Sequence, residues 1–298
     1  MLSGQSVEPP RLAAGLHIVA TPIGNLRDIT LRALETLAAA DLIACEDTRV
    51  TRKLLDHYGI ATPLTPYHEH NATEARPKLL ARLAAGESIA LVSDAGTPLI
   101  SDPGFKLVRA VSEVGLTIHA APGPSAALTA LAVAGLPTDR FFFEGFLPSK
   151  DGQRRNRIAE LCNIPATLIL YESGPRVGRT LQALAEILGA RQAAVCRELT
   201  KLHEEVRRGD LAALAKAYEE DAKFPAEIRG EFTLVIAPPT ASEAVMDADE
   251  MDAMLRKALR HASVKDAVSD VAHATGRPRR EIYQRALALS EGEDGAAE

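Results

Sequence analysis

Four short segments of this chain are rich in small polar or turn-forming residues, and each directly follows an apolar run. They are TPIGNL at 21–26, EDTR at 46–49, SDAGTP at 93–98 and PGPSA at 122–126. Glycine and proline let a backbone approach a ligand closely, while Ser, Thr, Asp and Asn side chains offer hydrogen bonds. Together the four segments predict one ligand site built from several loops.

A fifth segment, RELTKLHEE at 197–205, gathers ionisable side chains. Burial or neighbouring charges can shift the pKa of such groups until they transfer protons near neutral pH. The EDTR segment is a rival location for this chemistry, with Glu46, Asp47, Thr48 and Arg49. Either segment can instead form an ion-pair network between domains.

Several standard catalytic signatures are missing from the sequence. It has no G-x-G-x-x-G after the first apolar run and no P-loop, which are signatures of nucleotide binding. It also has no H-E-x-x-H, so no metal site is indicated. The stretch GPSAA at 123–127 resembles the nucleophile elbow of hydrolases, but it lacks the closing glycine. Ser125 is equally suited to cap the helix that follows.

The order of apolar runs predicts an α/β fold that holds these segments in place. A first half with a mostly parallel sheet is followed by a second half with a mixed sheet. Ligands of open α/β sheets bind at the carboxyl ends of the strands, where the four loops fall. The predicted strands are 16–20, 42–45, 88–93, 116–120, 141–146, 167–172, 193–198 and 231–236, with helices near 29–40, 48–57 and 73–85.

Length and composition set further bounds. A chain of 298 residues is long enough for two domains and an appendage, and its net charge of −6 argues against wrapping nucleic acid through whole-surface charge. Three widely spaced cysteines and no long apolar run predict a soluble cytoplasmic protein. The predicted organisation is an N-terminal domain at 15–136, a second domain at 137–240, an acidic linker at 241–253 and a small basic helical domain at 254–290.

Longer stretches carry a family resemblance. VATPIGNLRDIT, EDTR, SDAGTPLISDPG, PGPSA, FEGFLPSK, YES and RELTK occur in this order over residues 15–237. The chain thereby resembles the ribosomal RNA small subunit methyltransferase I family, which has the two-domain tetrapyrrole-methylase fold. It departs at SGPR, 173–176, where an aromatic or His-like residue is expected after the proline.

The resemblance implies 2'-O-methylation of a cytidine ribose in the decoding region of small-subunit (16S) ribosomal RNA, with S-adenosyl-L-methionine as cofactor. It also implies a homodimer and a cofactor site in the cleft between two α/β domains. A methylase of small tetrapyrroles and a noncatalytic RNA-binding protein of the same fold are the alternatives. The residues assigned to the cofactor are Pro22, Ser93, Asp94, Ala95, Gly96, Thr97, Ile100, Ser101, Pro122, Ser125, Ala126 and Tyr171.

Methylation of a hydroxyl needs a proton acceptor. Under the resemblance, Lys201 is the candidate base if burial or nearby cations depress its pKa, and Glu198 and Glu204 can orient it or take the proton. RNA contacts are predicted at two basic clusters, with Arg179, Arg207 and Arg208 as possible extensions. The clusters contain Lys150, Arg154, Arg155 and Arg157 after the strand at 141–146, and Arg277, Arg279 and Arg280 in the tail.

Overall fold

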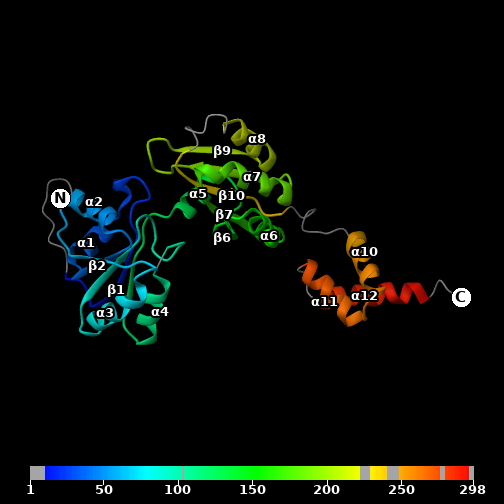
Figure 1. Cartoon of the computed structure of the whole chain (residues 1–298), viewed down its shortest axis with the longest axis horizontal. Helices are drawn as coiled ribbons and strands as arrows, with labels where there is room; N and C mark the ends of the chain where they lie inside the picture. The colour runs from blue at the N-terminus through cyan, green and yellow to red at the C-terminus, as the bar shows by residue number, and fades with distance from the viewer. Residues whose placement is uncertain (1–10, 103, 222–228, 240–247, 276–278, 295–298) are drawn as a thin grey trace.

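The computed structural model of the chain describes residues 11–102, 104–221, 229–239, 248–275 and 279–294. Two five-stranded sheets follow one another along the chain, and a group of helices forms a third unit towards the C-terminus (Figure 1). This confirms the predicted α/β class, with a parallel first sheet, a mixed second sheet and a helical tail. The predicted domain boundaries themselves stay predictions.

The first sheet is entirely parallel, with strand order β3-β2-β4-β1-β5. Four of its strands match predicted ones, whereas the short edge strand β3 was not predicted. The parallel direction places the carboxyl ends of β1, β2, β4 and β5 at one edge, as the loop argument requires. The strands are β1 (Gly15–Val19), β2 (Leu42–Cys45), β3 (Leu64–Pro66), β4 (Ser88–Val92) and β5 (Ile118–Ala121).

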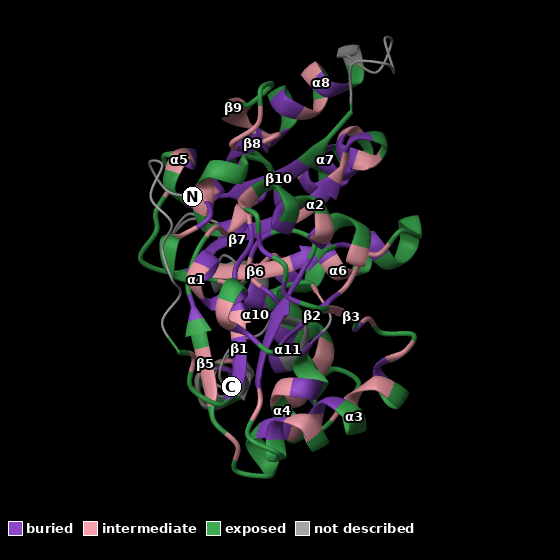
Figure 2. Ribbon diagram, turned by 90° about the vertical axis from the view of Figure 1, so that its left-hand side faces the viewer, coloured by how far each residue is buried: buried purple, intermediate pink, exposed green. Residues whose placement is uncertain are grey.

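Helices cover both faces of the first sheet. One face packs against α1 and α2, and the other against α3 and α4. Strands that are buried on both faces read as unbroken apolar runs, which explains IALV in β4. Figure 2 shows the inner strands β1 and β2 largely in the buried colour, whereas the edge strand β5 is mostly in the intermediate and exposed colours. The helices are η1 (Leu26–Asp28), α1 (Leu31–Ala39), α2 (Thr48–Tyr58), α3 (Ala72–Ala84) and α4 (Phe105–Glu113).

The second sheet has strand order β6-β7-β10-β8-β9. Its β6 and β7 are parallel, and the other neighbours are antiparallel. The edge strand β9 was not predicted. The strands are β6 (Phe141–Phe146), β7 (Thr167–Ser173), β8 (Gln192–Arg197), β9 (Glu205–Asp210) and β10 (Glu231–Ile236).

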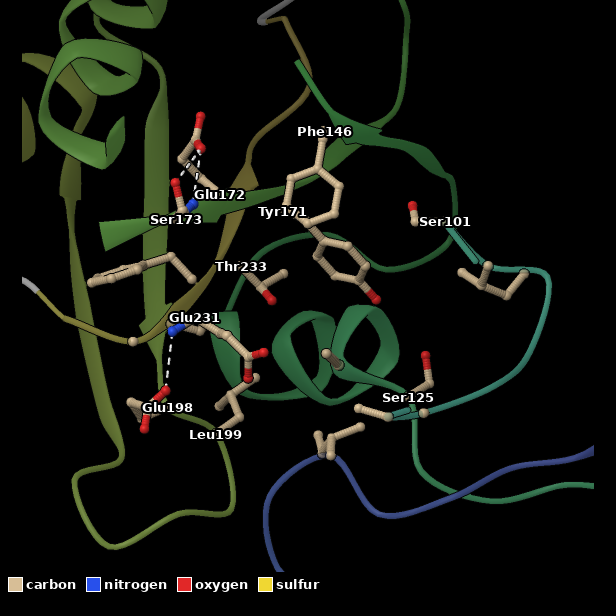
Figure 3. Close-up of a pocket in the computed structure, with 18 of the residues that line it drawn as sticks. Ser101, Ser125, Phe146, Tyr171, Glu172, Ser173, Glu198, Leu199, Glu231 and Thr233 are labelled. Carbon is tan, nitrogen blue, oxygen red and sulfur yellow. Dashed lines mark hydrogen bonds between the residues drawn. The ribbon is translucent and has the colours of Figure 1, made fainter. Parts of the chain in front are cut away.

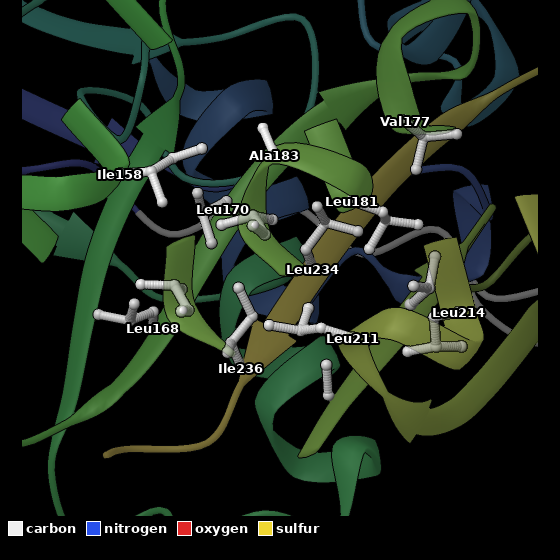
Figure 4. Packing of buried hydrophobic residues seen from close by; sticks show 14 of the residues in the cluster. Ile158, Leu168, Leu170, Val177, Leu181, Ala183, Leu211, Leu214, Leu234 and Ile236 are labelled. Carbon is white, nitrogen blue, oxygen red and sulfur yellow. The ribbon is translucent and has the colours of Figure 1, made fainter. Parts of the chain in front are cut away.

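The two faces of the second sheet are packed differently. One face carries a core of large aliphatic side chains, including Leu168, Leu181 and Leu234, under α6, α7 and α8 (Figure 4). The other face is covered by the alanine-rich α5, which packs on Ile169 and Val235. Thus α5, although it follows β5 directly, packs on the second sheet. The helices are α5 (Ala126–Ala134), α6 (Asp151–Leu161), α7 (Gly174–Leu188) and α8 (Leu211–Asp221).

Three further helices pack on one another around their own apolar cluster. Met251, Leu255, Val271 and Ile282 are buried within it. Arg285 donates two hydrogen bonds of 2.7 Å to the carboxylate of Asp252, whose side chain is 6% exposed. The helices are α10 (Ala248–Leu259), α11 (Val264–Thr275) and α12 (Arg279–Asp294).

Candidate functional site

A cavity of about 390 Å³ lies where the loops of the first sheet meet the second sheet (Figure 3). This volume falls within the range of about 300–1,000 Å³ that is typical of small-molecule sites. Its wall is formed by residues from both halves of the chain. They are Ile23, Ala95, Gly96, Thr97, Ile100, Ser101, Asp102, Ser125, Ala126, Phe146, Tyr171, Glu172, Ser173, Cys196, Glu198, Leu199, Lys201, Gly230, Glu231, Phe232 and Thr233.

Hydrogen bonds tie three of the first-sheet loops together. Thr21 and Gly96 exchange backbone bonds of 2.9 and 3.0 Å, which joins the loop after β1 to the loop after β4. The Thr97 hydroxyl donates to the carbonyl of Pro124, 3.2 Å away, and so joins the loop after β5. Gly96 has φ +79°, a left-handed conformation that favours glycine. Hydrogen bonds therefore hold together three of the loops that were predicted to converge.

The wall from the second sheet is partly aromatic. The ring of Tyr171 lies edge-on to Phe143 and Phe146, with centroids 5.0 and 5.6 Å apart. Its hydroxyl accepts a 3.2 Å hydrogen bond from the backbone N–H of Ala127 in the first turn of α5. Phe146 is 57% exposed at the cavity. The cavity thus has an aromatic wall beside a helix N-terminus, and Figure 3 shows the rings of Tyr171 and Phe146.

Lys201 holds two carboxylates together at the cavity. Its Nζ lies 2.9 Å from Glu198 Oε1 and 2.6 Å from Glu231 Oε2. Burial lowers the pKa of Lys201, but the hydrogen bonds to Glu231 and Glu198 outweigh burial and raise the pKa above its ordinary value. The prediction of Lys201 as a base with a depressed pKa is therefore wrong, because the structure stabilises its ammonium form.

The two predicted glutamates differ in position. Burial raises the pKa of Glu198, yet the backbone N–H of Glu231 and the ammonium of Lys201 lower it overall. Glu204 is exposed and does not line the cavity; it accepts a 2.6 Å hydrogen bond from the N–H of Thr200. Glu198 is thus a cavity carboxylate already paired with a cation, and Glu204 stabilises the turn that carries Lys201.

Eight of the twelve residues assigned to the cofactor line the cavity. They are Ala95, Gly96, Thr97, Ile100, Ser101, Ser125, Ala126 and Tyr171. The other four, Pro22, Ser93, Asp94 and Pro122, do not line it. Ser93 is 3% exposed beneath the loop, and the carboxylate of Asp94 accepts from the N–H of Asp47, 3.0 Å away.

The structure also shows the positions of two alternative candidates from the sequence, Ser125 and the EDTR segment. The hydroxyl of Ser125 accepts from the N–H of Leu128 as the N-cap of α5. In EDTR, Arg49 forms a surface ion pair of 2.7 Å with Asp47, and no residue of this segment lines the cavity. Of these two candidate segments, the one at 197–205 therefore brings ionisable groups to the cavity, Glu198 and Lys201, and EDTR brings none.

Sequence reasoning missed eleven residues of the wall. Most come from the second sheet, where β7 ends beside the start of β10 through antiparallel pairing of Ser173 with Glu231. The signals available were the SDPG stretch at 101–104 and the YES stretch at 171–173. The missed residues are Ile23, Asp102, Phe146, Glu172, Ser173, Cys196, Leu199, Gly230, Glu231, Phe232 and Thr233.

Arg176 of the SGPR departure has a structural partner. It lies 3.2 Å from the carboxylate of Glu172, and its Nη2 donates to the carbonyl of Leu147, 2.8 Å away. Glu172 also accepts a 2.7 Å bond from the Thr180 hydroxyl. Arg176 therefore supports a carboxylate of the cavity wall and ties it to the segment after β6.

The basic cluster after β6 is largely paired with carboxylates. The side chain of Arg154 is 6% exposed and bonded to Asp151, so the prediction that Arg154 contacts RNA is corrected by its burial. Arg155 pairs with Glu186, and Arg157 binds Glu144 through two bonds of 2.6 and 2.7 Å. Lys150 is exposed.

The other arginines that were predicted to contact RNA differ in their surroundings. Arg207 bonds to Glu205, and Arg208 donates to backbone carbonyls at the end of α5, including that of Ala134, 3.1 Å away. Arg279 is exposed and Arg179 is exposed. Arg277 and the side chain of Arg280 lie outside the described residues.

Within the described ranges, no helix is long and apolar enough to cross a membrane. The same part of the chain contains no group of three His, Cys, Asp or Glu side chains arranged to hold a metal ion.

Comparisons with known proteins give one consistent result. Residues 15–215 match the model of the tetrapyrrole (corrin/porphyrin) methylases, and residues 245–290 match that of the RsmI C-terminal HTH domain. The chain is 51% identical over 290 residues to ribosomal RNA small subunit methyltransferase I of Mesorhizobium japonicum, covering 97% of each chain. It is 44% identical to the protein of that name from Escherichia coli O157:H7, covering 91% of this chain and 94% of the relative. The crystal structure of diphthine synthase shares the fold, with a TM-score of 0.57, 16% identity and coverage of 74% and 89%.

Proposed function

This chain belongs to the tetrapyrrole methylase family and, within it, to the ribosomal RNA small subunit methyltransferase I proteins, and on this basis we propose that it methylates small-subunit ribosomal RNA. The reaction transfers a methyl group from S-adenosyl-L-methionine to the 2'-hydroxyl of a cytidine in the decoding region of 16S RNA. The observation that carries the proposal is relatedness over 97% of both chains.

The residues of the cavity fit S-adenosyl-L-methionine. When bound, this compound supplies a methyl group on a positively charged sulfonium, and it also carries an ammonium, ribose hydroxyls and an adenine. The wall offers matching chemistry in the carboxylates of Glu172 and Glu231, the aromatic side of Tyr171 and the small residues of the loop after β4. We assign the binding of the methyl donor to Ala95, Gly96, Thr97, Ile100, Ser101, Ser125, Ala126 and Tyr171, with Pro22, Ser93, Asp94 and Pro122 supporting their loops.

The main contribution of the protein to a methyl transfer is alignment in a site protected from water. The bonds that join Thr21 to Gly96 and Thr97 to Pro124 pre-organise the loops for this purpose. Lys201, held by Glu198 and Glu231, supplies a fixed positive charge at the rim. We infer that this ammonium orients an anionic group of the RNA, and that Glu198 and Glu204 position it.

Lys150, Arg155, Arg157, Arg279 and Arg280 are proposed to contact RNA phosphates, together with Arg277. We propose that the substrate is ribosomal RNA or the assembled small subunit, and that the enzyme acts in the cytoplasm. We also propose that the protein is a homodimer, on the basis of its family. Light scattering of the purified protein tests this, and a monomer at all concentrations would contradict it.

The decisive experiment offers a labelled methyl donor with small subunits, naked 16S RNA, transfer RNA or porphyrinoid precursors, and then maps any modified nucleotide. We expect label on one cytidine ribose of the small-subunit RNA. Lys201→Ala should lose most of this activity while still binding S-adenosylhomocysteine. Lys78→Ala is the matched control, because Lys78 also pairs with a glutamate at 2.7 Å but is 72% exposed on α3. Label only on porphyrinoid precursors, or on nothing, would refute the proposal.

A further inference from the structure

The turn between β8 and β9, residues 198–204, presents two exposed side chains beside the cavity. Glu198, Leu199 and Lys201 of this turn line the cavity, and Figure 3 shows the first two. The two residues that follow lie outside it: Leu202 is 92% exposed, and His203 is exposed as well. Leu199, in contrast, is buried in the apolar cluster between α5 and the second sheet. One leucine therefore anchors the turn, and the other is left in solvent.

Hydrogen bonds close this turn and fix it to β10. The N–H of Glu198 donates to the carbonyl of Glu231, 3.0 Å away, and the N–H of Glu231 donates to Glu198 Oε1 at 3.0 Å (Figure 3). Within the turn, the N–H of Lys201 donates to the carbonyl of Glu198 at 3.0 Å, and the N–H of Glu204 donates to that of Lys201 at 3.2 Å. The exposed tip, Leu202 and His203, therefore has a defined position relative to the cavity.

Two residues of the turn have a backbone conformation that residues with side chains disfavour. Glu198 and Thr200 have φ of 50° and 65°, in the left-handed region that non-glycine residues seldom adopt. Such a conformation is maintained only where the surroundings determine it, and it is common at functional sites. The turn is thus a rigid element held in an unfavourable conformation, with its tip in solvent.

The turn also contacts the first half of the chain. The aliphatic part of Lys201 lies against Gly24, in the loop after β1, so closely that a Cβ on Gly24 would lie 2.3 Å from Lys201 Cγ. The neighbouring Ile23 lines the cavity from the same loop. Leu202 and His203 therefore follow directly on a contact between the two halves of the protein, at the rim of the cavity that both halves form.

The charges around the tip favour an uncharged partner. Glu204 is exposed next to His203, and the side chain of Glu231 is 77% exposed. A phosphate at the tip would lie near these carboxylates, which repel it. The aliphatic side chain of Leu202 and the flat ring of His203 instead match the faces of nucleic-acid bases, which carry no charge and stack on histidine and aromatic rings.

We propose that Leu202 and His203 contact bases of the substrate RNA next to the nucleotide that is methylated, with His203 stacked on a base and Leu202 inserted beside it. This inference rests on the proposed function. Apolar side chains such as leucine insert between neighbouring bases and partly unstack them. The rigid turn thereby separates the target nucleotide from its neighbour, so that its ribose can reach the cavity.

The first test measures kcat/KM for small subunits with Leu202→Ala, His203→Ala and His203→Phe. Loss of one stacked base contact weakens binding by about 5–150-fold, so each alanine variant should lower kcat/KM by about this factor. His203→Phe keeps a flat ring and should retain most of the activity. Val114→Ala is the matched control and should behave as wild type, because it shortens an apolar side chain that is 60% exposed at the end of α4, away from the cavity wall.

Two further measurements distinguish a base contact from other effects. The alanine variants should keep the wild-type Tm and the wild-type affinity for S-adenosylhomocysteine, because both side chains are exposed and outside the cavity wall. Leu202→Ala should weaken RNA binding without changing its salt dependence, since a contact with a base releases no counterions. A reduced salt dependence would indicate a phosphate contact and would overturn the assignment to bases.

The partner of the tip can be identified directly by photo-cross-linking. Benzoylphenylalanine in place of Leu202 should cross-link, on irradiation with small subunits, to RNA within a few nucleotides of the methylated cytidine. The same group in place of Val114 should give no such product. Cross-links from the tip only to a ribosomal protein, or to a second copy of this chain, would show that it binds protein and would refute the inference.

The outcomes separate this inference from the proposed function. If the wild type methylates small-subunit RNA while Leu202→Ala and His203→Ala keep its kcat/KM, the role of the tip is refuted and the proposed function stands. A wild type that methylates none of the RNA substrates refutes the proposed function and this inference together.

Discussion

Replacement of Gly145 by alanine is expected to weaken the contact between the loop of Asp102 and the second sheet. Gly145 has φ +73°, and an added Cβ would lie 2.8 Å from Ser101 Oγ and at ordinary distance from the ring of Phe143. A left-handed conformation costs a residue with a Cβ about 1–2 kcal/mol. The short Oγ contact adds to this cost to the extent that the Ser101 side chain cannot rotate away.

Two other glycines separate these contributions. Gly59 has φ +68° and open space around its Cβ position, so Gly59→Ala measures the conformational cost alone. Gly152 lies in the first turn of α6 with open space and no positive φ, so Gly152→Ala should be neutral or stabilise the helix by up to about 1 kcal/mol. Combining Ser101→Ala with Gly145→Ala removes the Oγ of Ser101. The double variant should recover only the part of the lost stability that is due to the steric contact.

The assay is thermal unfolding, together with the methylation rate. A loss of about 1–2 kcal/mol corresponds to a fall in Tm of about 2–8 °C, from roughly 2–4 °C per kcal/mol in domains of this size. Gly145→Ala should also slow methylation, because Ser101 and its neighbour Asp102 form part of the cavity wall, whereas Gly59→Ala should not. If Gly145→Ala is as stable and active as Gly152→Ala, the argument from backbone conformation and close approach is refuted.

Three other predictions concern the cores and the tail. Leu168→Ala removes a fully buried side chain of the second sheet and should cost about 2–5 kcal/mol in denaturant unfolding, whereas the 53% exposed Leu128 should tolerate alanine. The hydrogen bonds of Arg285 lower the pKa of Asp252, so this pair stabilises the native helices above about pH 4 and the contribution is lost as the pH falls through the lowered native value. Hydrogen-exchange protection of α10, α11 and α12 should therefore fall on acidification more in the wild type than in Asp252→Asn; equal losses would contradict the sign. Deletion of residues 241–298 should weaken RNA binding and flatten its salt dependence without changing the affinity for S-adenosylhomocysteine, and an unchanged salt slope would refute an RNA-binding role of the tail.

The part of the site formed by the first sheet could be predicted, because its geometry follows from the common direction of the strands. Parallel strands bring their carboxyl ends to one edge, so loops far apart in sequence must meet, as Thr21 and Gly96 do. The second sheet gives no such rule. Glu231 starts β10 and reaches the cavity because β10 runs antiparallel to β7, and its contact with Lys201 joins residues 30 positions apart. Neither fact has a local signal in the sequence.

The two strands that were missed are both at edges. β3 is three residues long and ends in proline, and β9 reads EVRRGD, without an apolar alternation. An edge strand pairs on one side only and can carry charges, so its composition resembles a loop. Arg207 and Arg208, which the sequence predicts as possible extensions of an RNA surface, lie on β9. Their side chains instead bond to Glu205 and to the end of α5.

The basic cluster after β6 shows why a count of charges does not locate an RNA surface. A phosphate must displace the carboxylate that each arginine already holds, so the exposure of that carboxylate decides which arginine can be used. Arg155 and Glu186 are 42% and 43% exposed, and an exposed pair of this kind contributes little to stability, so a phosphate contact can replace it. Arg157 has a two-bond contact with Glu144, which is only 9% exposed and would be left buried without a partner. An RNA phosphate should therefore bind Arg155 more readily than Arg157. Arg155→Ala should reduce the salt dependence of RNA binding more than Arg157→Ala does.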